Sequence, residues 1–339
     1  MNVEERAMEI HRDAIVVDTH CDTLKCLSPL FTRARDAMWV DRSAVGLGSR
    51  ADVGHVDIPR LREGGVDCQV FAISSLRDRT PPFALRTALN MLDVFYAECK
   101  KNRDRIVPAT SHSDILRAVR GGKVAALLSI EGADVIEGSL GALRVFHRLG
   151  VRMVGLVHSR RNLLADGVTD SKTGGGLSEF GVEVVEELNC LGILIDVSHL
   201  SDAGFWDLVD VTKAPFVASH SNSRAVCDHP RNLTDDQIRA LADRGGVMGI
   251  NFAPAFVHPT HATVERVVDH IDHIVELVGA DHVGLGSDFD GIPATPEGLE
   301  DVSKMPNITR ELVRRGYPEE DIRKILGENH LRVFREVVG

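Results

Sequence analysis

Several features are missing from this sequence of 339 residues, and each absence excludes a class of protein. It has no long cluster of Lys or Arg, and its formal net charge of −11 argues against non-specific nucleic-acid binding. No stretch approaches the ~18 consecutive apolar residues of a membrane span. Residues 1–6 are charged rather than apolar, and the C-terminal end has the pattern of an amphipathic helix. We therefore expect a cytoplasmic protein with neither a nucleic-acid nor a membrane partner.

Two sequence motifs of common cofactor sites are also missing. The six cysteines contain no Cys-x-x-Cys pair, which argues against a zinc ribbon. In a reducing compartment we expect them to be small buried side chains rather than disulfides. No Gly-x-Gly-x-x-Gly follows the first apolar run, so a dinucleotide-binding fold is disfavoured.

The sequence does contain six short apolar runs that each end in a residue able to bind a metal or move a proton. The first run, residues 15–17, leads into Asp18-Thr19-His20-Cys21-Asp22. Side chains two apart in a strand face the same side, so His20 and Asp22 can converge on one ion, with Cys21 directed away from them. The other five runs end at Glu131, His158, His199, His220 and Asp288. One such triplet is common by chance, but its recurrence indicates a metalloenzyme.

Strand-like runs alternate with helical periodicity in eight units along the chain. The predicted strands are 15–20, 68–75, 124–130, 151–158, 192–199, 216–220, 246–252 and 282–288. The predicted helices include 85–100, 140–149, 179–191 and 235–244. Eight units without hairpin signals favour a closed (β/α)8 TIM barrel of the metal-dependent hydrolase type over an open doubly wound sheet. We expect residues 1–339 to form this one domain.

Four connections after predicted strands are much longer than the usual ~2–6 residues. They cover residues 23–57, 159–178, 221–234 and 253–263. Active sites of such barrels lie on the loops at the carboxyl ends of the strands, where the six polar residues also lie. We therefore expect these loops to form the walls of the site.

Five of the residues at or near strand ends, His20, Asp22, Glu131, His199 and His220, supply three imidazoles and two carboxylates. One ion needs three or four protein ligands, whereas five ligands with a bridging carboxylate suit two ions about 3.5–4 Å apart. Nitrogen and oxygen donors without Cys fit Zn²⁺, with Mn²⁺, Co²⁺ or Fe²⁺ as alternatives. Two such ions would acidify a shared water to hydroxide and polarise a carbonyl for attack.

Eight segments in order along the chain resemble the motifs of the renal (membrane) dipeptidases, which are zinc-dependent barrels of the amidohydrolase superfamily. These segments are 18–22, 130–132, 156–158, 195–199, 219–221, 230–232, 286–291 and 296–301. The resemblance extends from about residue 8 to the C-terminus. It implies that His20 and Asp22 bind one zinc ion, that His199 and His220 bind the other, and that Glu131 bridges the two.

The resemblance also implies roles for three further residues in hydrolysis of a small dipeptide. Asp288 would transfer a proton, His158 would contact the scissile carbonyl oxygen, and Arg231 would receive the terminal carboxylate of the substrate. At the end of the second strand the chain has Ser74, where the family is expected to have a tyrosine. This difference leaves the preferred dipeptide open, and the oligomeric state, including a homodimer, is open as well.

Two other functions remain as alternatives. Another amidohydrolase reaction on a small amide, lactone or phosphoester is one, but many such relatives use His-x-His and a carbamylated Lys. This chain has His-x-Asp and Glu131 and no Lys at a strand end, which favours the dipeptidase branch. A catalytically silent metal-binding protein is the second alternative, and it would be expected to lack Asp288.

Overall fold

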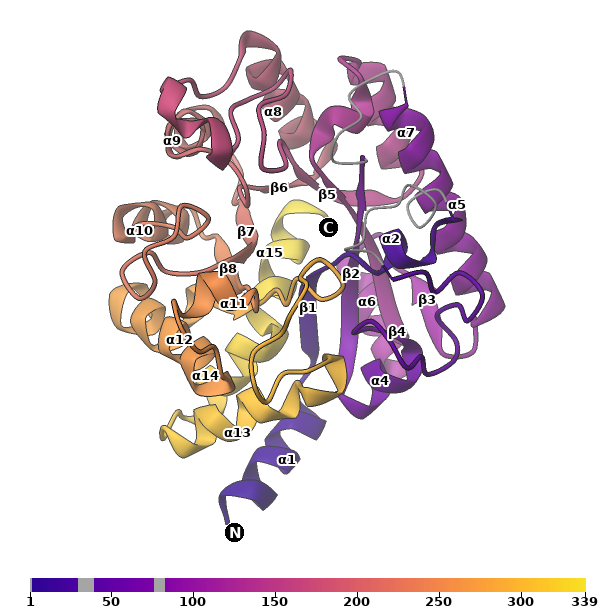
Figure 1. The fold of residues 1–339 in the computed structure, drawn as a ribbon, viewed down its shortest axis with the longest axis vertical. Helices are drawn as coiled ribbons and strands as arrows, with labels where there is room; N and C mark the ends of the chain where they lie inside the picture. The colour runs from indigo at the N-terminus through magenta and orange to yellow at the C-terminus, as the bar shows by residue number, and fades with distance from the viewer. Residues whose placement is uncertain (1, 30–39, 76–82) are drawn as a thin grey trace.

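The computed structural model describes residues 2–29, 40–75 and 83–339. Within these residues, parallel strands form one sheet in the order β2-β1-β9-β8-β7-β6-β5-β4-β3, and a further pairing of β2 with β4 closes it. The strands are β1 (Val16–Cys21), β2 (Val66–Ser74), β3 (Ile106–Pro108), β4 (Val124–Glu131), β5 (Val151–Gly155), β6 (Leu194–Asp196), β7 (Val217–Ser221), β8 (Val247–Ile250) and β9 (Val283–Leu285). Helices surround them (Figure 1).

Eight of the strands form a closed parallel barrel, which confirms the predicted (β/α)8 fold. The strand β3 is an addition that the sequence analysis did not predict. It pairs with the first residues of β4, from Ile106 opposite Val124, whereas β5 pairs with β4 from Leu128 onward. Because β2 pairs with one edge of β4, β3 and β5 share the opposite edge. Along this edge, β3 pairs with the start of β4 and β5 pairs with its carboxyl-terminal half.

The helices alternate with the strands. The α-helices are α1 (Val3–Asp13), α2 (Thr23–Leu27), α4 (Ile58–Glu63), α5 (Ala84–Lys101), α6 (His112–Arg120), α7 (Leu140–Arg148), α8 (Glu179–Leu191), α9 (Asp202–Val211), α10 (Asp235–Asp243), α11 (Pro254–Val257), α12 (Val264–Val278), α13 (Pro306–Arg314), α14 (Glu319–Arg323) and α15 (Asn329–Val337). Short 3-10 or π turns are η1 (Ala133–Ile136), η2 (Val168–Thr173), η3 (Ala280–His282), η4 (Val302–Lys304) and η5 (Lys324–Glu328). None of the helices in the described ranges is long and apolar enough to cross a bilayer.

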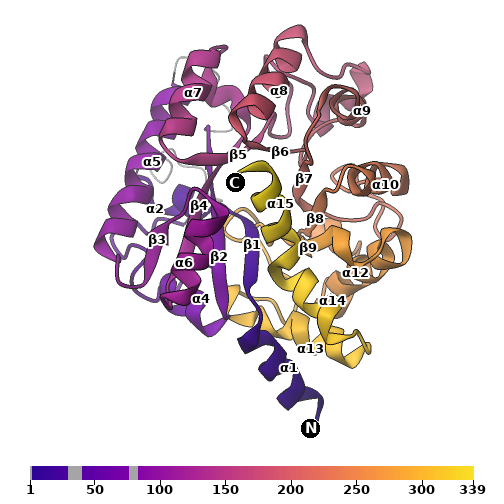
Figure 2. The same ribbon diagram turned by 180° about the vertical axis from the view of Figure 1, so that it is seen from behind.

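The strand residues divide between two hydrophobic clusters according to the alternation of side chains in a strand. Val16 and Leu128 pack in the larger cluster with the surrounding helices. Val17 and Leu127 pack in a separate inner cluster, to which α15 contributes Phe334. Figure 2 shows α15 crossing this end of the barrel. The amino-terminal end of the barrel is therefore filled by apolar side chains, and the carboxyl end is left to carry polar groups.

Several predicted strands are too long at their carboxyl ends. The predicted strands 151–158, 192–199 and 282–288 end in the structure at Gly155, Asp196 and Leu285. The residues beyond these points leave the sheet to build the loops above the barrel. The helix predicted at 179–191 coincides with α8, which is capped by Gly192 in a left-handed conformation (φ 66°).

The long connections are confirmed in position but are not wholly irregular. The connection 23–57 begins with α2, and its residues 30–39 lie outside the described residues. The connections 159–178 and 253–263 contain η2 and α11. All six cysteines are free thiols, as predicted, and five of them are buried, whereas Cys190 is exposed.

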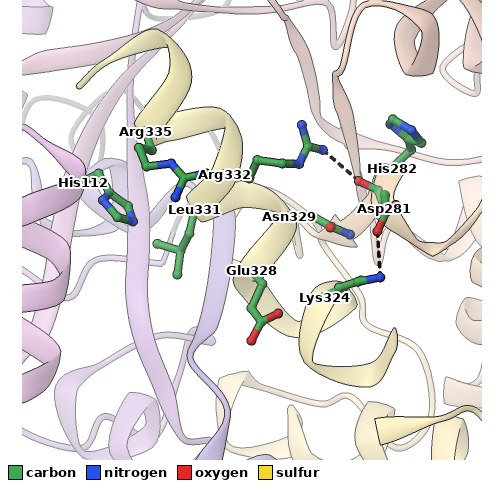
Figure 3. A pocket seen from close by; sticks show the side chains of 9 residues that line it. All are labelled: His112, Asp281, His282, Lys324, Glu328, Asn329, Leu331, Arg332 and Arg335. Carbon is green, nitrogen blue, oxygen red and sulfur yellow. Dashed lines mark hydrogen bonds and ion pairs between the residues drawn. The ribbon is translucent and has the colours of Figure 1, made fainter. Parts of the chain in front are cut away.

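A cavity of about 480 Å³ lies at the other end of the barrel, beside α15 and the turn before β9 (Figure 3). Lys324 lies 3.0 Å from a carboxylate oxygen of Asp281, and Arg332 donates a hydrogen bond of 2.9 Å to the Asp281 carbonyl. None of the predicted site residues lines this cavity. The predicted site residues lie instead at the carboxyl ends of the strands.

Candidate metal centre

The predicted site residues meet at the carboxyl ends of the barrel strands. His20 lies on β1, Glu131 is the last residue of β4, and His220 lies on β7. His199 and Asp288 follow β6 and β9 by three residues each. All five are buried, with at most 8% of each residue exposed. Their arrangement follows from the barrel topology, because parallel strands deliver their last residues to the same end.

Three overlapping groups of side chains could each hold a divalent ion. In each group, the candidate ligand atoms lie within 4.8 Å of one another. The groups are Glu131 with His199 and His220, His20 with Asp22 and Glu131, and His20 with His220 and Asp288. Glu131 is the residue that the first two of these groups share, as expected of a carboxylate that bridges two ions, and the third group joins one histidine from each of them to Asp288.

The tip of β1 is not the regular strand that the sequence analysis assumed. The pairing with β2 is irregular between Asp18 and Cys21, and Asp22 precedes the first turn of α2. Asp22 nevertheless reaches the same group as His20. The backbone N–H of Asp22 donates to the Phe289 carbonyl at 2.8 Å, and that of Asp288 donates to the His20 carbonyl at 3.2 Å. These bonds hold the tip of β1 against the loop that carries Asp288.

A chain of hydrogen bonds from Asp196 through Ser219 to His220 determines which nitrogen of His220 is available to bind a metal. Ser219 Oγ lies 2.5 Å from an oxygen of Asp196 and 2.7 Å from His220 Nδ1. A carboxylate can only accept, so the single hydroxyl proton of Ser219 goes to Asp196, and Ser219 accepts from the Nδ1–H of His220. Nε2 of His220 then carries a lone pair and faces the other ligands. Such outer partners orient metal-binding histidines.

The second imidazole of this group, His199, has a left-handed backbone conformation with φ 71°. Its Nε2 lies 3.0 Å from Nε2 of His220 and 3.1 Å from Oε1 of Glu131. Burial, followed by the positive charge of Arg231, lowers the pKa of His199 well below its ordinary value. The pKa of His220 is likewise lowered by burial and by neighbouring histidines. Both rings are therefore neutral, which is the form that binds a metal.

The residues present fit a divalent transition metal. Nε2 of His20 is buried without a hydrogen-bond partner among the described residues, and its ring stacks on that of His220 at 3.8 Å. Burial would raise the pKa of Glu131, but Lys25 and the nearby imidazoles lower it well below its ordinary value. An ionised carboxylate beside the neutral rings of His199 and His220, together with the unpaired Nε2 of His20, is a donor set suited to Zn²⁺ or a similar ion.

Asp288 lies where a group that transfers protons could act. Its backbone is left-handed, with φ 63°, and one of its oxygens accepts a hydrogen bond of 3.0 Å from Asn251. Burial raises the pKa of Asp288 to about 6, and the negative charges of Asp22 and Glu131 act in the same direction. A carboxyl group with a pKa near neutrality can both accept and donate a proton.

His158 and Arg231 border the metal ligands. His158 stacks on His199 at 4.3 Å, its Nε2 lies 3.6 Å from Oε1 of Glu131, and 24% of its side chain is exposed. Arg231 is buried and donates a hydrogen bond of 3.1 Å to the His220 carbonyl. Its Nε has no hydrogen-bond partner within the ranges that the structure describes. An accessible imidazole and a buried guanidinium therefore flank the centre.

Three polar residues of the site were not among the predicted site residues. Asp196 and Asn251 hold His220 and Asp288 in place through the bonds described above. Lys25, on α2, extends into the centre, where its ammonium nitrogen lies 2.6 Å from Asp22 and 3.0 Å from Glu131. Its spacing of three residues from Asp22, one turn of helix, was the signal that could have identified it.

Ser74, the residue that departs from the expected family pattern, is the last residue of β2 and pairs in register with Glu131. Its Oγ is buried and has no hydrogen-bond partner in the described part of the chain. The position at which we expect a difference from the family therefore lies directly beside the candidate metal ligands.

Comparison with known proteins gives the chain its family. The family model described as "Membrane dipeptidase (Peptidase family M19)" matches residues 4–338. The chain is 38% identical over 295 residues to "Dipeptidase tcpJ" of Claviceps purpurea (strain 20.1), covering 84% of this chain and 69% of that protein. It is 34% identical over 344 residues to "Dipeptidase verJ" of Clonostachys rogersoniana, covering 98% and 86% of the two chains.

Among solved structures, a metallo peptidase from Rhodobacter sphaeroides liganded with a phosphinate mimic of the dipeptide L-Ala-D-Ala superposes with a TM-score of 0.84. It is 32% identical in sequence, and the match covers 96% of this chain and 100% of that one. The resemblance inferred from the motifs is thereby confirmed, and the chain belongs to the membrane dipeptidase family, peptidase family M19.

Proposed function

We propose that this metal-dependent dipeptidase holds two zinc ions and cleaves the peptide bond of small dipeptides. His20 and Asp22 would bind one ion, His199 and His220 the other, and Glu131 both. The observation that carries the proposal is the sharing of Glu131 by two groups of closely spaced ligand atoms. We further propose that residues 1–339 act as one barrel domain.

The bound ions would acidify a water molecule and polarise the scissile carbonyl. Two residues of the chain would transfer the proton and stabilise the carbonyl oxygen. Asp288, whose pKa is raised to about 6, would accept the proton of the attacking water and deliver it to the leaving amine. His158, which is partly exposed beside Glu131, would donate a hydrogen bond to the carbonyl oxygen.

Arg231 would select substrates that end one residue beyond the scissile bond. The guanidinium is fixed to the His220 carbonyl, and its buried Nε has no partner among the described residues. A carboxylate can satisfy two guanidinium N–H groups at once, so the free terminus of a dipeptide would bind here. The dipeptide mimic bound to the Rhodobacter sphaeroides relative supports a substrate of this size.

The metal count tests the centre itself. We expect elemental analysis of protein purified from zinc-supplemented medium to approach two ions per chain. The Glu131→Gln variant should bind fewer, because a neutral amide bridges two cations poorly. A metal content near zero in the wild-type protein would refute the proposed centre.

The activity test compares a good dipeptide with its C-terminal amide and with a tripeptide extended at the same end. Both changes should lower kcat/KM at least ~10-fold, since each removes the carboxylate from Arg231. Arg231→Met should abolish the preference for the acid over the amide. Equal hydrolysis of acid and amide by the wild-type enzyme would exclude Arg231 from the site and favour another amide substrate.

A further inference from the structure

Lys25 is a buried cation in contact with two of the proposed metal ligands. Only 3% of the residue is exposed. Its ammonium nitrogen lies 2.6 Å from Oδ1 of Asp22 and 3.0 Å from Oε2 of Glu131. It is held there by α2, whose first turn follows Asp22 directly. The functions proposed above do not involve this side chain.

The two carboxylate oxygens of Glu131 have different neighbours. Its Oε1 faces the imidazoles, at 3.1 Å from His199, 3.6 Å from His20 and 3.7 Å from His220. Its Oε2 faces Lys25 instead. The group of Glu131, His199 and His220 can therefore form through Oε1. In the group of His20, Asp22 and Glu131, by contrast, both carboxylates contact the ammonium.

Buried carboxylates need a positive charge nearby, and a divalent ion and an ammonium can both supply it. Two cations that share the same oxygens repel each other, so an ion that binds between His20 and Asp22 must displace Lys25 from at least one carboxylate. No such displacement is required at the position formed by His199 and His220. The asymmetry of the contacts therefore predicts an asymmetry of affinity.

We propose that Lys25 is an internal counter-ion of the metal centre, which neutralises Asp22 and Glu131 when no ion is bound between them. It thereby makes the position formed by His20 and Asp22 the weaker of the two. This inference rests on the proposed dinuclear centre. Its consequence is stepwise loading: the position at His199 and His220 fills first, and the position beside Lys25 fills at higher metal concentration.

The test compares the wild-type protein with Lys25→Met, which keeps the length of the side chain and removes its charge. Chelator-stripped protein is titrated with Zn²⁺ against a competing chelator of known affinity. We expect two separate steps in the wild type. In Lys25→Met the weaker step should tighten by about 10–100-fold, the range typical of changes beside a metal ligand. The tighter step should change less than about threefold.

Thermal melting of the stripped proteins gives a second measurement. Lys25→Met should melt below the wild type without metal, because two buried carboxylates lose their counter-ion, and should recover when Zn²⁺ is added. Lys101→Met, which removes a lysine whose side chain is 62% exposed, is the matched control and should change neither measurement. If Lys25→Met folds only with metal, the rate at which a chelator removes the more labile ion is measured instead, and it should be slower than in the wild type.

The outcomes separate the two proposals. Identical stepwise affinities, or identical rates of metal loss, in the wild type and Lys25→Met would overturn the role of Lys25 while leaving the metal centre intact. Unchanged affinities together with a raised KM for dipeptides would show that Lys25 binds substrate instead. Failure of the wild type to bind any Zn²⁺ would refute the centre itself, and the inference with it.

Discussion

Arg42 should contribute several kcal/mol to stability through a buried ion network, although it contacts no proposed metal ligand. Its side chain is fully buried, donates to the Val56 carbonyl at 2.8 Å, and lies 3.7 Å from Asp57 and 3.6 Å from Asp290. Removing one partner of a buried ion pair costs about 3–5 kcal/mol. Asp57 keeps a second partner, Arg60 at 2.8 Å, so we expect the lower end of that range for Arg42→Met.

The corresponding change in melting temperature follows from the size of the chain. At about 2.1 cal/mol/K per residue, the 339 residues unfold with an entropy of about 0.7 kcal/mol/K. A loss of about 3 kcal/mol should therefore lower Tm by about 4 °C, as measured by circular dichroism of the zinc-saturated protein. The double variant Arg42→Met/Asp290→Asn should regain part of this loss, because it removes a carboxylate left without its guanidinium.

The matched control is Arg50→Met. Arg50 forms an ion pair with Glu63, but the two side chains are 53% and 51% exposed, so Tm should not change measurably. If Arg42→Met lowered Tm no more than Arg50→Met, the buried network would not be stabilising, and the reasoning from burial would be wrong.

Three further predictions concern single side chains. Asp288→Asn should keep its metal content, since Asn tolerates a left-handed backbone, but lose ~10²–10⁴-fold in kcat; retention of a tenth of the turnover would exclude Asp288 as the proton-transfer group. Ser219→Ala should weaken zinc binding about 10–100-fold in chelator competition, because the chain of hydrogen bonds to His220 is broken. Burial raises the pKa of Asp67 from 3.8 to about 6, so stability falls as the pH rises through this interval and the full loss persists above it; Asp67→Asn should raise Tm more at pH 8 than at pH 5, and an equal gain at both would contradict the shift.

The barrel and its ligand end could be predicted from the sequence because both depend on local patterns. Each apolar run marks a strand, and the polar residue that closes the run marks the end where parallel strands meet. Glu131, the last residue of β4, lies where this rule places it. The rule places His199 and Asp288 correctly at the same end, but it overestimates the length of their strands, because both residues lie in turns beyond β6 and β9.

The supporting contacts could not be predicted, because they join residues that are distant in the sequence. Asn251 reaches Asp288 and Arg42 reaches Asp290 across intervals of 37 and 248 residues that carry no sequence pattern. Lys25 is a different case: its spacing of three residues from Asp22 is visible in the sequence, but a lysine is ordinarily a surface residue, and only the packing of α2 against the barrel buries it. The charged residues that contact the ligands are thus harder to predict from the sequence than the ligands themselves.

The left-handed backbones of His199 and Asp288 predict which substitutions would arise in this sequence if it were no longer selected for activity. That conformation costs roughly 1–2 kcal/mol for a residue such as His and less for Asp, whose short polar side chain tolerates it. Glycine would remove this cost at either position, but it would also remove the imidazole or the carboxyl group. A library of variants selected for thermal stability alone should therefore accumulate glycine at 199 and 288, whereas selection for turnover should restore His and Asp. Comparing the two sets of selected variants would identify the positions at which a catalytically required residue lowers the stability of the protein.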